Sequence, residues 1–167
     1  MDTMHALKST LRFSSRVIPA NVVREIIRSA MISSHRANAV AFQFVVIDDR
    51  SILDDIPTFH SSAQMVLDAP IAILICGEHA DELSKDAWFR ECLAISEHLL
   101  IAVQAHGLGA LRLSIYPVDE RIDGMQSLLG LPRTIIPVSL IPIGYPLDDE
   151  GYSSRRYNGT KVHYNHW

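Results

Sequence analysis

The sequence has little cysteine, no excess of positive charge and no long uninterrupted hydrophobic run. Its 167 residues include two cysteines, Cys76 and Cys92, both in apolar surroundings, which favours buried reduced thiols over a disulfide framework. The net charge of −4 and the scattered Lys and Arg argue against nucleic acid as a partner. Every apolar run stops well short of the roughly 18 residues that a membrane span needs, so we expect no membrane partner.

Several catalytic and targeting patterns are also missing. The N-terminus lacks a positive run followed by an apolar core and a cleavage site, so we expect a cytoplasmic protein. No Gly-x-Ser-x-Gly motif anchors a hydrolase triad. The stretch "GLGALR" has Arg112 in place of the third glycine and follows a helix, which argues against a dinucleotide fingerprint. His163 and His166 have no third ligand of matching spacing, so we expect no metal.

The composition that remains is that of a globular protein, with 48% hydrophobic and 20% charged residues. The length suits a single domain covering 1–167. From about 147 to 167 the apolar pattern fades while aromatic residues stay frequent. We expect this stretch to be an extended tail that docks on another surface.

Hydrophobic periodicity predicts three main helices. The first covers about 19–33, the second covers 85–105 and stops at Gly107, and the third covers 117–130. The intervening stretch 51–68 has mixed periodicity and is interpreted as one or two short helices.

Short β-branched or continuously apolar runs predict four strands, at 42–49, 69–77, 108–114 and 134–146. The first two are interpreted as central strands. Pro137 and Pro142 each remove a ladder donor from the last strand, which predicts a place at or near a sheet edge. Helices and strands do not alternate regularly, so we expect an α+β fold with a mixed sheet.

The joint between the first helix and the first strand is unusually polar. It contains neither Gly nor Pro, the residues that turn the chain for backbone reasons, but offers hydroxyl, imidazole, guanidinium and amide groups from Ser33, Ser34, His35, Arg36 and Asn38. This set of groups suits the binding of a polar ligand.

Taken together, several segments resemble the nitroreductase family of flavoenzymes. The segments are "KSTLRF", "DAPIAILIC", "WFRECLAISEHLLIAVQAHGLGALRLSIYP", "LLGLP", "IPIGYP" and "KVHYNHW". The resemblance covers nearly the whole chain. It implies an α+β nitroreductase-like fold with a mixed, mostly antiparallel sheet flanked by helices. It also implies a homodimer with FMN at each subunit interface and a C-terminal tail embracing the partner subunit.

The resemblance implies a set of cofactor-binding residues. The joint would lie beside the flavin ring, where Asn38 could bond its polar edge with His35 or Arg36 nearby. The main chain around Arg112, Leu113 and Ser114 matches the segment that reaches the flavin in relatives.

A dianionic phosphate needs cations and N–H donors, and the family draws them from two ends of the chain. Lys8 and Ser9 fit the N-terminal motif, whereas Leu11 departs from it, so Arg12 would have to compensate. Arg155 or Arg156 stands where the family has a late arginine.

The joint also departs from the family, since Ser34-His35 replaces the usual Pro-Ser. Val40, Ala41 and Phe42 replace the usual Gln-Pro-Trp. These changes affect positions expected to bind the cofactor and to line the substrate pocket.

The function implied is that of an FMN-dependent oxidoreductase. Electrons would pass from NAD(P)H through FMN to a small acceptor such as a nitroaromatic, quinone or enone, by a ping-pong mechanism. The flavin N5 would carry the chemistry, so no side chain is named as catalytic. Two alternatives remain open, a non-catalytic flavin-binding or storage protein and a cofactor-free interaction module with the same fold.

Overall fold

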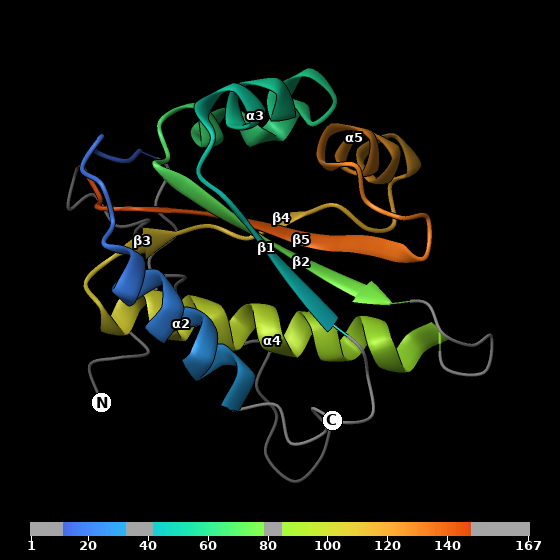
Figure 1. Ribbon diagram of the computed structural model, residues 1–167, viewed down its shortest axis with the longest axis horizontal. Helices are drawn as coiled ribbons and strands as arrows, with labels where there is room; N and C mark the ends of the chain where they lie inside the picture. Colours follow the sequence, from blue (N-terminus) through green and yellow to red (C-terminus); the bar gives the residue numbers. More distant parts are fainter. Residues whose placement is uncertain (1–11, 33–41, 79–84, 148–167) are drawn as a thin grey trace, which may run out of the picture.

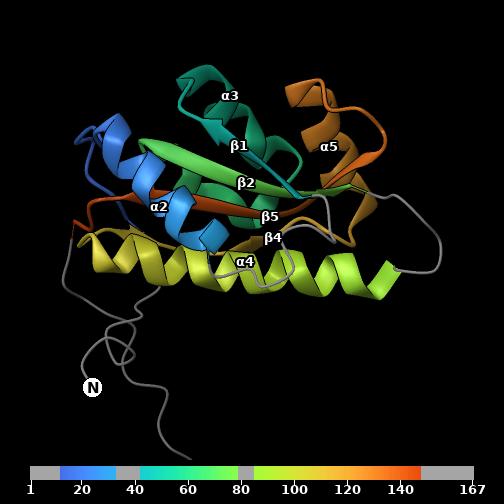
Figure 2. The ribbon, with the colours of Figure 1, turned by 60° about the horizontal axis from the view of Figure 1, so that its bottom comes forward.

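The computed structural model describes residues 12–32, 42–78 and 85–147. One sheet separates two helical layers, with α2 and α4 on one face and α3 and α5 on the other (Figure 1). Turning the molecule shows α4 running along its own face of the sheet while α3 and α5 stay on the opposite side (Figure 2). The elements in chain order are α2 (Ala20–Ile32), β1 (Phe42–Ile47), α3 (Arg50–Asp55), the 3₁₀ helices η1 (Ile56–Thr58) and η2 (Ser61–Leu67), β2 (Ile71–Glu78), α4 (Lys85–Ala105), β3 (Gly109–Ala110), β4 (Leu113–Ser114), α5 (Asp119–Leu129) and β5 (Ile135–Gly144).

The sheet has the strand order β1-β2-β5-β3, and β4 also pairs with β5. All of these described pairings are antiparallel, which agrees with the predicted α+β class. Two predicted strand positions are wrong. The strand at 42–49, expected to be central, is the edge strand β1, and the strand at 134–146, expected at or near an edge, is β5 in the interior of the sheet.

Local breaks in the ladder let β5 carry two prolines inside the sheet. Pro137 lies at a register shift, because Ile75 pairs with Ser139 whereas the next residue, Cys76, pairs with Pro137. Pro142 falls opposite the stretch between β3 and β4, where the ladder along β5 is interrupted. A missing N–H is tolerated at such irregularities, so proline alone did not identify an edge strand.

Strand β2 is buried on both faces and separates two hydrophobic cores. Ile73 and Ile75 face the core under α2 and α4, whereas Leu74 and Cys76 face the core under α3 and α5. This double burial explains why the sequence of β2 is continuously apolar instead of alternating.

The helices largely follow the predicted bounds. Helix α4 ends at Ala105 shortly before Gly107, which has φ of 70°. Helix α5 begins two residues after Pro117, and Gly130 caps its end with φ of 63° while donating its N–H to Gln126 O. Both glycines adopt the left-handed conformation that commonly terminates helices. None of the described helices has the length and apolar character needed to cross a membrane.

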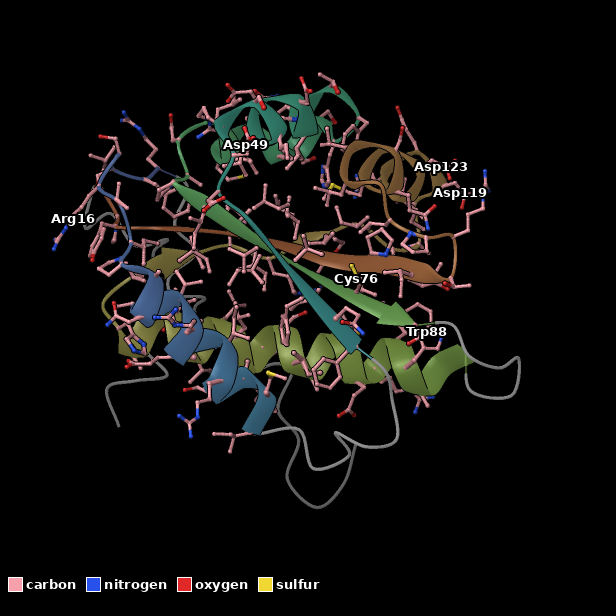
Figure 3. All side chains as sticks on the ribbon, viewed as in Figure 1. Arg16, Asp49, Cys76, Trp88, Asp119 and Asp123 are labelled. Carbon is pink, nitrogen blue, oxygen red and sulfur yellow. The ribbon has the colours of Figure 1, made fainter. Side chains whose placement is uncertain are left out.

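The start of the described chain is tied to the end of β5. Phe13 forms a β-bridge with Pro146, and Ser14 N donates to Tyr145 O over 2.8 Å. The Arg16 guanidinium lies 4.0 Å from the centre of the Tyr145 ring and marks this end of the molecule (Figure 3). Phe13 also packs against Gly144, since a Cβ added to this glycine would lie 2.8 Å from the Cβ of Phe13. This end of the sheet is therefore closely packed.

Candidate functional site

Residues 109–114, which contain β3 and β4, form the edge of the described sheet beyond β5. Gly109 pairs with Gly144 at one end of this segment, and Ser114 pairs with Ser139 at the other. Among the described strands, none pairs with the outer side of the segment. Main-chain groups on this side are therefore not paired with another described strand, and Ser114 is the exposed residue of the segment.

Ser114 directs its main-chain polar groups toward this open side. The next residue, Ile115, donates its N–H to Val138 O on β5 over 3.0 Å. Because bonding direction alternates along an antiparallel ladder, the N–H and C=O of Ser114 point away from β5. Two side chains bind the carbonyl from that side, since His60 Nε2 lies 3.2 Å and Arg121 Nη1 lies 2.8 Å from Ser114 O. The Ser114 N–H is left as an outward donor.

His60 is a buried histidine, with 2% of its surface exposed. Burial is the main cause that lowers its pKa from 6.5, the Arg121 charge lowers it further, and the contact with Ser114 O opposes both. The imidazole is therefore neutral at neutral pH. Since a carbonyl can only accept, Nε2 carries the proton and Nδ1 is an unprotonated acceptor. Nδ1 is buried and has no hydrogen-bond partner among the described residues.

A second cation stands at the same edge on the α4 side. Arg112 Nε lies 3.3 Å from Glu97 Oε1, and both side chains are partly exposed. An exposed pair of this kind stabilises the fold by at most about 1 kcal/mol, so Arg112 could turn to a stronger anionic partner at small cost.

An aromatic cluster lies just beyond Ser114. The Tyr116 ring centre is 5.3 Å from that of Trp88 and 4.9 Å from that of Phe89. These contacts join the end of the edge segment to α4, where the labelled Trp88 lies between the helix and β2 (Figure 3).

The structure describes four of the site residues expected from the sequence. It brings Arg112, Leu113 and Ser114 together on the edge segment, where Leu113 is 7% exposed and, by the same alternation, turns its main-chain polar groups toward β5. Arg12 lies at the other end of that segment, because its carbonyl accepts from Leu147 N just beyond β5. The other expected residues lie outside the described residues, namely Lys8, Ser9, His35, Arg36, Asn38, Arg155 and Arg156.

Sequence reasoning missed His60 and Arg121. His60 is 54 residues from Ser114 and Arg121 only 7 residues from it, and neither residue stands in a motif that indicates this common contact. Within the described ranges, no group of three or more His, Cys, Asp and Glu side chains is placed to hold a metal ion.

Comparison with known proteins gives relatives along the whole chain. No protein-family model matches the sequence. A Methanothermobacter thermautotrophicus protein, provisionally named NADH dehydrogenase/NAD(P)H nitroreductase, is 31% identical over 170 residues, which cover 100% of this chain and 88% of the relative. A crystal structure with the same provisional name, from Parabacteroides distasonis, has 32% identity and a TM-score of 0.87, with 99% of this chain and 97% of the other covered. An FMN-dependent nitroreductase from Clostridium difficile shares the fold, with a TM-score of 0.82 at 18% identity, over 96% of this chain and 95% of the other.

Proposed function

Since the chain belongs to the nitroreductase family, we propose that it is an FMN-dependent oxidoreductase that moves electrons from NADH or NADPH to a small acceptor. The observation that carries the proposal is the open edge at 109–114, whose outward N–H at Ser114 falls in the segment that the family resemblance assigns to the flavin. Names of relatives support the two cofactors, since they include NAD(P)H nitroreductase and FMN-dependent nitroreductase.

The described residues fit FMN in their chemistry. The polar edge of a flavin ring carries carbonyl oxygens and ring nitrogens, for which the Ser114 N–H is a suitable donor. Two guanidinium groups of the type that binds phosphate lie along the segment. Arg112 is near the Ser114 donor, and Arg12 is at the other end. An elongated molecule with a polar ring at one end and a phosphate at the other suits this arrangement.

The remaining contacts are part of the proposal. Lys8 and Ser9, with Arg155 or Arg156, complete the phosphate site beside Arg12. The joint residues His35, Arg36 and Asn38 contribute to the ring site.

Bound FMN would supply the electron-transfer chemistry between the nicotinamide and an acceptor such as a nitroaromatic, quinone or enone. The protein contributes binding and orientation, and no side chain is proposed as an essential acid or base. Donor and acceptor use one site in turn, so steady-state plots at several acceptor concentrations should give parallel lines, the pattern of a ping-pong cycle.

A homodimer is part of this proposal. Helices α2 and α4 expose large apolar side chains, since Met31, Ile32 and Ile101 are 45%, 73% and 46% exposed. A second copy would cover this layer, with the 147–167 tail embracing it. We also propose that the protein works in the cytoplasm.

Identification of the cofactor tests the proposal. Purified protein is heated, and the released material is separated by chromatography against FMN and FAD standards. We expect FMN at about one molecule per chain, because a closed cationic phosphate site leaves no room for an adenylate. Recovery of FAD alone, or a protein that stays colourless after FMN is added, contradicts the proposal.

A further inference from the structure

Two side chains from different elements converge on one main-chain carbonyl of the edge segment. Ser114 O accepts from His60 Nε2, between η1 and η2, and from Arg121 Nη1 on α5. A carbonyl oxygen has two lone pairs, and these two bonds use both of them. The Ser114–Ile115 peptide group is thereby restrained along two directions, although it lies at a sheet edge where carbonyls commonly bind water.

One packing contact brings both donors to this carbonyl. Phe59, directly before His60, lies so close to Gly124 that a Cβ on this glycine would be 2.4 Å from Phe59 Cγ. Gly124 is three residues after Arg121, so the two residues share a face of α5. The close approach of α5 to Phe59 therefore places Arg121 and His60 on the same side of Ser114.

Fold stability does not account well for a histidine at position 60. Its ring is buried and neutral, and Nδ1 lacks a partner within the described ranges. A buried polar atom without a hydrogen bond is destabilising, whereas an apolar side chain of similar size would avoid that cost. What the imidazole adds is a directed N–H toward Ser114 O.

We propose that His60 and Arg121 are positioning residues, which hold the Ser114 carbonyl and thereby aim the N–H of Ser114 at the flavin. The inference rests on the proposed function, since it takes the flavin as the ligand of this edge. Neither side chain needs to contact the cofactor. Both act by holding the Ser114–Ile115 peptide group, which is joined through the Ser114 Cα to the Leu113–Ser114 peptide group that carries the donor.

Substitutions at both positions test the inference. His60→Leu removes one donor together with the orphaned nitrogen, and His60→Gln retains an N–H that can reach the carbonyl. Arg121→Gln removes the charge from a helix surface position, and Arg121→Lys retains it. Arg133→Gln is the matched control, because Arg133 is an exposed arginine outside the site.

Three readouts separate positioning from a purely structural role. They are FMN affinity by fluorescence quenching, the visible spectrum of bound FMN, and amide hydrogen exchange of the peptide spanning 111–118 in apo-protein. Loss of either donor to Ser114 O should weaken FMN binding roughly three- to tenfold, which corresponds to the loss of one hydrogen bond. The same loss should shift the spectrum of bound flavin and speed amide exchange at 111–118. His60→Leu should keep or raise the apo-protein melting temperature, His60→Gln should restore part of the affinity, and Arg133→Gln should match the parent protein.

Variants that bind FMN with parental affinity and spectrum overturn the inference, even where their melting temperatures fall. If His60→Leu yields no folded protein, the variants Arg121→Gln and Arg121→Lys test the inference by the same three readouts. A parent protein that does not bind FMN refutes the proposed function itself and removes the basis of the inference. A parent that binds FMN alongside unaffected variants refutes only the positioning role.

Discussion

The indole ring of Trp88 lies against Gly77, so that a Cβ on this glycine would be 2.4 Å from Trp88 Cε3 and 3.2 Å from Cys92 Sγ. Gly77 belongs to β2 and Trp88 to α4, so this contact sets how closely the long helix approaches the sheet. Trp88 also packs on Tyr116, two residues beyond Ser114. The spacing between helix and sheet is thus linked to the edge that carries the candidate site.

Gly77→Ala should destabilise the protein by about 1–3 kcal/mol, because the added methyl overpacks a core that has no space for it. The unfolding free energy in urea measures this cost. In a Trp88→Leu background the same change should cost less, because the ring that it strikes is gone. Equal costs in the two backgrounds would show that the contact does not limit the approach of α4.

The two cysteines should be unreactive in the native protein. Burial raises the pKa of Cys76 to about 12, with a smaller contribution from Cys92 nearby. Burial also raises the pKa of Cys92 to about 12, with a smaller contribution from Glu91. The reactive thiolate is therefore scarce at neutral pH. A colorimetric thiol reagent should label neither cysteine in native protein and both in denaturant, and fast labelling under native conditions would contradict this.

Stability should fall on acidification through His60. Its pKa is below 6.5 in the folded protein, mainly because of burial, so the unfolded chain binds more protons between the folded pKa and 6.5. The unfolding free energy therefore decreases as pH falls through that window, and no further loss comes from this group below the folded pKa. Comparing parent and His60→Leu apo-protein at several pH values isolates the group. If the unfolding free energies of the two proteins change with pH in parallel, the prediction is contradicted.

The α2/α4 layer should be the dimer surface. Ile101→Glu on α4 should shift the protein toward monomers, because a carboxylate would be buried without a partner in the interface. Leu67→Glu is a matched control, since Leu67 is 42% exposed, against 46% for Ile101, and lies on η2 in the opposite layer. Light scattering after size-exclusion chromatography gives the mass. A monomeric parent, or equal effects of the two substitutions, would contradict the assignment.

Local features of the fold were predictable from the sequence, whereas strand order was not. Helical periodicity and the stops at Gly107 and Gly130 act within a few residues, and the structure confirms them. The central place of β5 depends on ladder breaks beside Pro137 and Pro142, which are set by partner strands distant in sequence. No local pattern in β5 reveals those breaks.

The same distinction holds for the site. The family resemblance pointed to Arg112, Leu113 and Ser114, and the structure places all three on one open edge. His60 could not be found in this way, because its proposed role depends on a contact with a main-chain atom 54 residues away. Such a contact constrains one side chain and leaves no periodic signal in the sequence.

The most direct test of the account is the visible spectrum of the purified protein, recorded without oxygen before and after addition of NADH or NADPH. We predict a yellow protein that a nicotinamide bleaches, and whose colour returns when a nitroaromatic or quinone is added. A protein that stays colourless after incubation with FMN would contradict flavin binding. A yellow protein that dithionite bleaches, but that neither nicotinamide bleaches, would contradict the proposed activity and indicate a flavin-storage role instead.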